Sequence, residues 1–354
     1  MSSVDAARWD ESYARDWYER QPWLVGCNFI PSTAVNQLEM WQAPTFDEAT
    51  IDRELSWAEG LGFNTARVFL HDLLWEADEP GFARRIQRFL QIAASHGIRT
   101  MFVLFDDCWH GGPRLGRQPP PVPGVHNSRW LQSPGCDAID DQASWPRLEA
   151  YVTGVVRAFG ADERVLGWDL YNEVTNLFLV PPGLNGAERA EASRAAALRR
   201  AKRAERHLQL FDQAFAWARA ARPRQPLTAG VWLRDRELNA RIIERSDIVT
   251  FHNYEDTQAL TTHIERLRRY HRPLLCTEYM ARTTGSRFAT HLPVFQRERV
   301  GCYNWGLVNG KTQTHIAWTP RADDEWFHDI FYADGRPYDE AEVAAIRTLT
   351  GVSA

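Results

Sequence analysis

Eight short apolar runs, separated by segments with helical periodicity, constrain the fold more than any other feature of this sequence. Between the runs, stretches such as 51–61 and 81–96 carry apolar residues at intervals of three and four, the period of an amphipathic helix. Strands that alternate with helices pair in parallel through right-handed crossovers. The eight runs are 24–30, 64–70, 99–105, 165–171, 227–232, 248–252, 273–278 and 301–305.

Eight such units predict an α/β fold, a single (β/α)8 TIM barrel over residues 1–354 with enlarged βα loops. A doubly wound open sheet is the alternative, but the sequence contains neither GxGxxG nor GxxxxGK[ST], the usual nucleotide motifs of such sheets. The length of 354 residues fits a barrel of about 250 residues with long loops, or two domains of about 150 residues. Residues 1–23 are expected to pack across the barrel through Trp9, Trp17 and Trp23.

Residues 108–147 form a long Pro/Gly-rich segment directly after the third run. Loops of this length usually have a function, and the carboxyl ends of barrel strands form the active-site face. The segment carries His126, Asn127 and Trp130, so we expect it to be an active-site loop. A stiff surface strut built on Pro119–Pro121 is the alternative interpretation.

Composition narrows the possible partners. With 46 acidic and 41 basic residues the net charge is −5, which provides no overall attraction for nucleic acid or an anionic membrane surface. The five cysteines include no CxxC pair, which argues against a zinc site or a disulfide framework, and no cofactor or metal is expected. The first twenty residues lack the apolar stretch of a signal peptide, and no segment reaches the ~20 apolar residues of a membrane helix. We therefore expect a cytoplasmic protein, whose oligomeric state the sequence does not indicate.

Two of the apolar runs stop on a carboxylate. Asn172-Glu173 follows the fourth run directly, and the seventh run ends in Glu278. Strands four and seven lie on opposite sides of a barrel, so the two carboxyl groups can face each other across its mouth. Glycoside cleavage requires such a pair, since one carboxyl group protonates the leaving oxygen while the other attacks or activates water.

These strand ends resemble those of glycoside hydrolase clan A, and most closely its cellulase-like family 5, over roughly residues 24–310. The resemblance implies a retaining glycosidase without a cofactor, in which Glu173 is the acid/base and Glu278 the nucleophile. It further implies that Asn172 binds the sugar 2-hydroxyl, Arg67 supports the nucleophile, His252 and Tyr254 form a His-x-Tyr pair, and Trp305 is the platform under the reacting sugar. Many family members also have a His near the end of strand three, where this chain has Asp106 and Trp109 as replacements.

The chemistry sets further expectations. Apolar neighbours and the charge of Glu278 should raise the pKa of Glu173, while Arg67 and Tyr254 should keep Glu278 ionised. In a retaining enzyme the carboxyl groups lie about 5–5.5 Å apart.

Outside the strand ends, Glu39 and Trp41 could contact a terminal sugar and Lys311 a leaving-group sugar. Taken singly, the main site residues have structural explanations as well, as a helix cap, an ion pair or core filling.

The missing secretion signal favours a short oligosaccharide as substrate. Among family 5 members, intracellular enzymes of this length resemble exo-β-mannosidases, so the leading hypothesis is an exo-β-mannosidase acting on β-1,4-mannosides. An endo-β-1,4-glycanase (glucanase, mannanase or xylanase) would use the same carboxylates in an open groove. A non-catalytic carbohydrate-binding barrel is the alternative that is not an enzyme.

Overall fold

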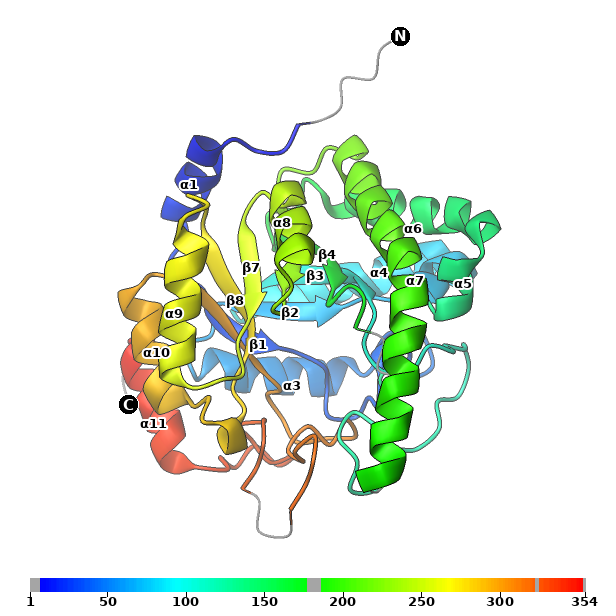
Figure 1. Ribbon diagram of the computed structural model, residues 1–354. Helices are drawn as coiled ribbons and strands as arrows, with labels where there is room; N and C mark the ends of the chain where they lie inside the picture. Colours follow the sequence, from blue (N-terminus) through cyan, green and yellow to red (C-terminus); the bar gives the residue numbers. More distant parts are fainter. Residues whose placement is uncertain (1–6, 177–185, 322–324, 353–354) are drawn as a thin grey trace.

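A parallel sheet that closes on itself forms the centre of the molecule (Figure 1). The computed structural model describes residues 7–176, 186–321 and 325–352. In this part of the chain nine strands are hydrogen-bonded in the order β5-β4-β3-β2-β1-β9-β8-β7-β6. The strands are β1 (Val25–Asn28), β2 (Thr65–Phe69), β3 (Arg99–Asp106), β4 (Val165–Asn172), β5 (Leu227–Thr228), β6 (Gly230–Val231), β7 (Val249–His252), β8 (Leu274–Tyr279) and β9 (Gly301–Trp305).

The two ends of this order are one interrupted barrel strand. β5 pairs with β4, β6 pairs with β7, and only Ala229 separates β5 from β6. The predicted fifth run, 227–232, therefore covers both short strands, and the other seven runs match the remaining strands. The structure confirms the expected (β/α)8 barrel.

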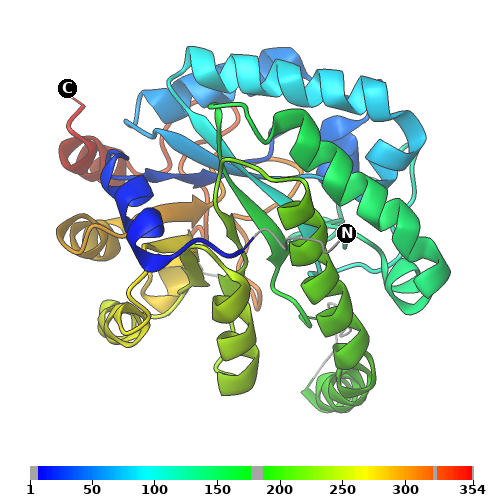
Figure 2. The ribbon, with the colours of Figure 1, turned by 90° about the horizontal axis from the view of Figure 1, so that it is seen from above.

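Helices surround the sheet, as Figure 2 shows from the side of α1. The strand-to-strand connections carry α3, α4, α6, α7, α8, α9 and α10, and α11 follows β9. The helices are α1 (Glu11–Glu19), α2 (Gln37–Trp41), α3 (Glu48–Glu59), α4 (Asp72–Ser95), α5 (Cys136–Asp140), α6 (Trp145–Phe159), α7 (Gly186–Ala220), α8 (Arg236–Arg245), α9 (Thr257–Arg268), α10 (Phe288–Arg297) and α11 (Glu340–Thr350), with 3-10 turns at Gln142–Ser144 and Arg282–Thr284. None of the described helices is long and apolar enough to cross a membrane.

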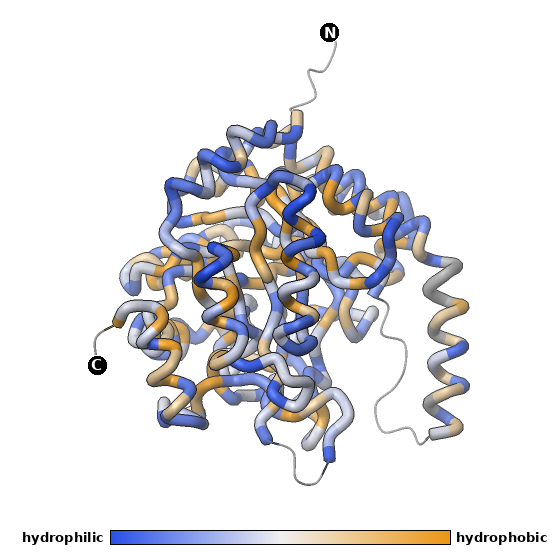
Figure 3. The backbone as a smooth tube through the Cα atoms, turned by 60° about the vertical axis from the view of Figure 1, so that its left-hand side comes forward, coloured by the Kyte–Doolittle hydropathy of each residue, from blue (hydrophilic) through white to orange (hydrophobic). Residues whose placement is uncertain are grey.

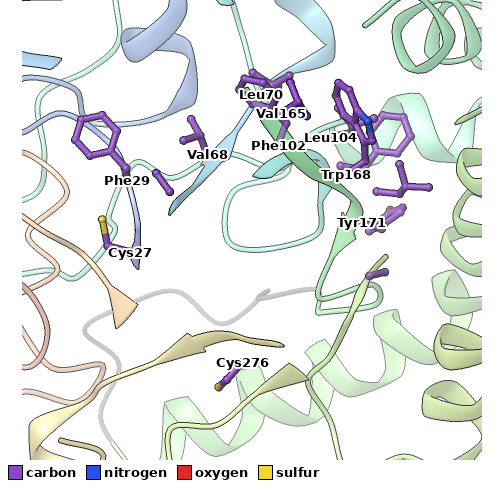
Figure 4. Close-up of a cluster of buried hydrophobic side chains, with 14 of the residues drawn as sticks. Cys27, Phe29, Val68, Leu70, Phe102, Leu104, Val165, Trp168, Tyr171 and Cys276 are labelled. Atoms are coloured by element: carbon purple, nitrogen blue, oxygen red, sulfur yellow. The ribbon is translucent and has the colours of Figure 1, made fainter. Parts of the chain in front are cut away.

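Side-chain alternation along the strands separates two apolar regions. Val68 and Phe102 belong to the large cluster between strands and helices, part of which Figure 4 shows. Phe69 and Val103, one position further along, belong to a smaller cluster with Trp305. Successive residues of a strand point to opposite faces, so one set packs against the helices and the other fills the barrel. Figure 3 shows hydrophobic segments among the central strands, and hydrophobic and hydrophilic residues that alternate along the outer helices.

The N-terminal helix α1 covers the amino-terminal end of the barrel. Trp17 and Tyr18 are buried there against residues at or near the starts of the strands, and Trp9 packs beside them. The other residues of this cluster lie in the strands or directly before them, and they are Leu24, Met101, Leu166, Ile248, Leu275 and Tyr303. The long loops that follow the strands lie at the opposite end of the barrel, where the strands end.

Candidate active site

Glu173 and Glu278 face each other at the carboxyl end of the barrel. His252 lies between them, with its Nδ1 atom 2.8 Å from Glu173 Oε1 and 3.4 Å from Glu278 Oε2. One carboxylate oxygen of each glutamate and a ring nitrogen of His252 all lie within 4.8 Å of one another. This limit on the separation of the nearest oxygens is compatible with the roughly 5–5.5 Å between the carboxyl groups of retaining glycosidases.

Arg67 lies under Glu278 inside the barrel and is fully buried. Its Nη1 donates to Glu278 Oε1 and to Asn28 at 2.8 Å each, and its Nη2 donates to Asn172 Oδ1 at 2.7 Å. Nε and Nη2 also bond Asp169 Oδ2, at 3.0 and 2.7 Å. These five bonds use all five N–H groups of the guanidinium, so Arg67 holds the parts of the site in one fixed geometry.

The second oxygen of Glu278 accepts a hydrogen bond from the Tyr254 hydroxyl at 2.9 Å. Burial and the charge of Glu278 raise the pKa of Tyr254 well above its usual value, so the phenol keeps its proton and acts as donor. Burial also raises the pKa of Glu278, with a further contribution from Glu173, although His252 and Arg67 oppose the shift. Glu278 is thus a doubly hydrogen-bonded carboxylate whose ionisation depends on its cationic neighbours.

The prediction for the pKa of Glu173 was wrong in sign. Burial favours its neutral form, but the hydrogen bond and charge of His252 outweigh burial and hold the pKa of Glu173 below its usual value. Burial likewise favours neutral His252, but the charge of Glu278 and the bond to Glu173 raise the pKa of His252 above its usual value. In the site as described, the proton therefore lies on His252 Nδ1. Transfer over 2.8 Å would place it on Glu173, because that distance is within ordinary hydrogen-bond reach.

This shared proton predicts the pH dependence. Activity requires ionised Glu278 and one proton on the Glu173–His252 pair, so the acid limb should lie above pH 4.5 and the alkaline limb above pH 6.5. In His252→Asn only Glu173 can hold the proton, and the alkaline limb of kcat/KM should move to lower pH. His263→Asn is the control, since burial lowers the pKa of His263 to about 4 and the ring bonds neither carboxylate. An unchanged alkaline limb in His252→Asn would refute the shared proton.

The turn that carries Glu173 is held in an uncommon conformation. Glu173 and Thr175 have φ angles of 44° and 70°, in the left-handed region that costs free energy for residues other than glycine. Asp107, at the end of the neighbouring strand, holds this turn. It accepts hydrogen bonds from Thr175 N at 2.6 Å and from the Tyr171 hydroxyl at 2.8 Å, and its Oδ2 lies 2.7 Å from His207 Nδ1 on α7. Two further groups donate to Glu173 Oε2, the Cys108 thiol at 3.1 Å and the Asn176 amide.

A cavity of about 270 Å³ opens above the two carboxylates. Aromatic, amide and imidazole side chains line it, as is common in sites for small polar ligands. The predicted residues Asn172, Tyr254, Trp305 and Trp109 lie in its wall with Glu173 and Glu278. The other lining residues are Cys108, His126, Asn127, Trp130, Asn176, Trp232, Trp318 and His328.

The 108–147 segment forms one wall of this cavity. Its backbone is tied to the loop after β9, through Asn127 N to Thr312 O at 2.8 Å and through Gln313 Nε2 to the carbonyls of Val122 and Val125. On the other side it is tied to the loop after β1, where the Asn36 side chain bonds Gln118 and the Arg129 carbonyl. The segment is thus bonded to two other loops at the rim.

Six predicted contact residues do not line the cavity. Arg67 and His252 contact the carboxylates, as described above, and the other four have structural partners. Trp41, expected to stack on a sugar, is fully buried: its indole N–H bonds the Phe69 carbonyl and its ring stacks on Phe46. Glu39 and Lys311 form an ion pair with each other at 2.9 Å. Asp106 lies beneath the floor, where it accepts hydrogen bonds from Asn172 at 3.0 Å and from the Trp130 indole at 2.7 Å. Asp106 therefore holds two lining residues in place rather than replacing the missing His.

Solved structures with the same barrel fold include several glycosidases. The exo-β-1,4-mannosidase from Opitutaceae bacterium strain TAV5 superposes with a TM-score of 0.58 at 18% identity, covering 93% of this chain and 60% of that chain. GH5_18 from Streptomyces cattleya in complex with GlcNAc gives 0.56 at 14% identity, covering 94% and 81%. The endo-β-1,4-mannanase from Thermotoga petrophila gives 0.54 at 13%, covering 93% and 76%.

The chain shares their barrel fold. It spans 60% of the length of the Opitutaceae chain, and the identities are too low to carry more than the fold. No protein-family model matches the chain, and a search of curated proteins finds no similar sequence.

Several residues that line the cavity were not predicted from the sequence. Asn176 follows Glu173 by three residues, and Trp232 ends the fifth apolar run, so both could have been found from strand ends. Trp318 and His328 lie far beyond the last strand, in a loop without periodic pattern. Because they are far along the sequence from any predicted strand end, the sequence pattern did not indicate them as site residues.

A metal ion has one possible site among the described residues. Glu173, His252 and Glu278 offer two carboxylate oxygens and one ring nitrogen close enough together to hold a cation. The same atoms are already engaged with one another, with Arg67 and with Tyr254. These hydrogen bonds account for the cluster without an ion.

The position of His252 depends on Gly230 in the neighbouring strand. A Cβ atom at Gly230 would lie 2.9 Å from His252 Nε2, closer than Cβ atoms approach other atoms in proteins, and a tight 3.3 Å from its Cδ2. Gly230→Ala should therefore displace the ring from Glu173 and lower kcat by roughly ten- to hundredfold, the cost of small misplacements in active sites. Gly167→Ala is the matched control, because its Cβ would meet its nearest neighbours at an ordinary 3.5 Å. Equal activity of the two variants in a steady-state assay would show that the His252 position is not critical.

Proposed function

We propose that this protein is a retaining β-glycosidase that removes a terminal sugar from short β-linked oligosaccharides by double displacement. Glu278 attacks the anomeric carbon and Glu173 protonates the leaving oxygen, after which Glu173 accepts a proton from the water that releases the sugar. The observation that carries the proposal is the pair of carboxyl groups with oxygens within 4.8 Å, one bonded by Arg67 and Tyr254 and the other by His252. The barrel fold shared with known glycosidases supports it.

Exo action is supported by the shape of the site. Glu173 must lie on the side of the leaving group, since it donates the proton to the leaving oxygen. On that side a second hollow, of about 930 Å³, shares Glu173, Trp232 and Tyr254 with the cavity and is also lined by His252. The smaller cavity, with its wall of residues 108–147, would hold the single sugar that becomes the glycosyl-enzyme.

For the glycone we infer a β-mannoside, in particular a β-1,4-linked one. The support is the similarity in fold to an exo-β-1,4-mannosidase and the small size of the cavity, which lies just below the roughly 300–1,000 Å³ of small-molecule sites. An endo-β-1,4-glycanase remains the second candidate, because the large hollow could accept several sugar units beyond the scissile bond.

Product analysis tests the proposal. The purified protein is given β-1,4-linked mannosyl, glucosyl and xylosyl oligosaccharides of two to five units, and ¹H NMR follows the first product. We expect mannose from the first minutes, released as the β-anomer, with unchanged rates after treatment with EDTA. Internal cleavage of the pentamer would replace the exo assignment, and an α-anomeric first product would overturn the retaining mechanism. Absence of hydrolysis across the panel would favour a carbohydrate-binding barrel.

A further inference from the structure

Two imidazoles, His126 and His328, lie together in the wall of the cavity away from the proposed catalytic pair. Their ring centroids are 5.4 Å apart, and both side chains are buried. His126 comes from the 108–147 segment and His328 from the loop after β9, so they meet where those two loops are joined. Trp318 and Phe327 pack against the His126 ring at steep angles.

The backbone determines which ring nitrogen carries the proton. His126 Nδ1 lies 2.7 Å from the Ile316 carbonyl, and His328 Nδ1 bonds the Met280 carbonyl. A carbonyl oxygen can only accept, so each Nδ1 must donate. Burial lowers the pKa of His126 to about 4 and that of His328 well below its usual value, with a further contribution to His328 from His126. Both rings are therefore neutral near pH 7, and each Nε2 carries a lone pair that can only accept.

In the described part of the chain, His328 Nε2 is buried without a hydrogen-bond partner. The side-chain oxygen of Asn127, another residue that lines the cavity, is also buried without a hydrogen-bond partner. Asn127 is held by its backbone, which donates to Thr312 and accepts from Trp130 N, in a left-handed conformation with φ 45°. Buried polar atoms in native proteins nearly always have partners, and the residues that carry these two acceptors both line the cavity. A ligand held in the cavity would be the source of the missing donors.

We propose that His328 Nε2 and Asn127 Oδ1 each accept a hydrogen bond from a hydroxyl group of the glycone, and so make this wall selective for a neutral, hydroxylated sugar. The inference rests on the proposed glycosidase function. Among the described lining residues there is no Lys or Arg, and the charged groups are the carboxyl groups of Glu173 and Glu278. A uronide, whose carboxylate has no proton to donate at neutral pH, would meet acceptors and negative charge there. Neutral sugars should therefore be strongly preferred over uronides.

Monodeoxy substrates test the contacts directly. The aryl β-glycoside that the wild type hydrolyses best is compared with its 2-, 3-, 4- and 6-deoxy analogues, using kcat/KM for the wild type, His328→Phe and His328→Gln. Each analogue is compared between enzymes, so differences in its intrinsic reactivity cancel. We expect the wild type to disfavour one analogue by roughly ten- to hundredfold because its acceptor is left unpaired, and His328→Phe to lose that preference. His328→Gln, which restores an amide acceptor, should regain part of it.

The other deoxy positions are the internal control, since their discrimination should stay the same in His328→Phe. Asn127→Leu should lose discrimination at a different hydroxyl. An equal loss on the parent and all analogues would show that His328 has a structural role only, and would overturn the inference while leaving the glycosidase function intact. Faster hydrolysis of the β-glucuronide than of the neutral glycosides would also overturn it.

A binding measurement separates this inference from the proposed function. If the wild type hydrolyses none of the glycosides, calorimetry with mannose, glucose and their deoxy derivatives is carried out on the wild type and His328→Phe. Binding that weakens selectively on loss of one hydroxyl, in the wild type alone, would support the hydroxyl contacts and reject catalysis. Absence of any binding would overturn both proposals.

Discussion

Replacement of Glu278 by alanine should lower the hydrolysis of an aryl β-glycoside by on the order of 10⁴- to 10⁶-fold, the loss seen when a catalytic nucleophile or its base is removed. The reason is that no other described carboxylate faces the anomeric carbon with the support of Arg67 and Tyr254. Circular dichroism and the unfolding midpoint should remain close to the wild type, because Arg67 keeps Asp169 as its buried counter-charge when Glu278 is removed.

Azide distinguishes the two carboxylates. In Glu278→Ala, azide can occupy the space of the lost carboxylate and attack the anomeric carbon, while Glu173 protonates the departing aryl oxide, so the product is the α-glycosyl azide. In Glu173→Ala with a dinitrophenyl glycoside, Glu278 still forms the covalent intermediate without an acid, and azide then displaces it to give the β-glycosyl azide. Products of the opposite configurations, seen by NMR, would exchange the roles of the two residues. Rescue of neither variant would count against double displacement.

Replacement of Arg67 by methionine should cost about 3–5 kcal/mol of unfolding free energy, because it leaves buried Asp169 and Glu278 without their cation. Urea unfolding measures the loss. The exposed pair Arg336–Asp334 provides the control, since Arg336→Met breaks an ion pair that solvent already screens and should leave stability unchanged.

A second substitution separates stability from activity at this position. In Arg67→Met/Asp169→Leu the charge opposite Arg67 is also removed, and a packed apolar pair should recover much of the lost stability. Hydrolysis should remain low, because Glu278 and Asn172 still lack the guanidinium that holds them. Recovery of both properties would mean that Arg67 is only a structural ion-pair partner.

Much of the fold was predictable because its signal is local. The strands carry buried apolar runs, and even the interrupted fifth strand is one continuous run, 227–232, in the sequence. Glu173, Glu278 and Arg67 could be placed because they lie at or near strand ends, whose position in a barrel is set by strand order. Trp41 was placed wrongly because the segment after β1 forms the short helix α2, which turns this ring into the core.

The electrostatics of the site were not predictable to the same degree. The sign of the Glu173 pKa shift depends on the 2.8 Å contact with His252, which is 79 residues away in the sequence. His328 reaches the cavity through the pairing of two long loops, and loop pairing leaves no periodic pattern. The sequence therefore predicts which strands carry the chemistry, whereas the three-dimensional contacts decide where its proton lies.

The position of α1 at the amino-terminal end of the barrel has a practical consequence for using the protein. Trp17 and Tyr18 pack at the end of the barrel where the strands begin, whereas the cavity lies where they end. Figure 1 shows α1 at the first of these ends, so a tag or fusion partner joined ahead of α1 would be attached on the side away from the cavity. Beads or sensor surfaces coupled through that end should leave the mouth facing the solution.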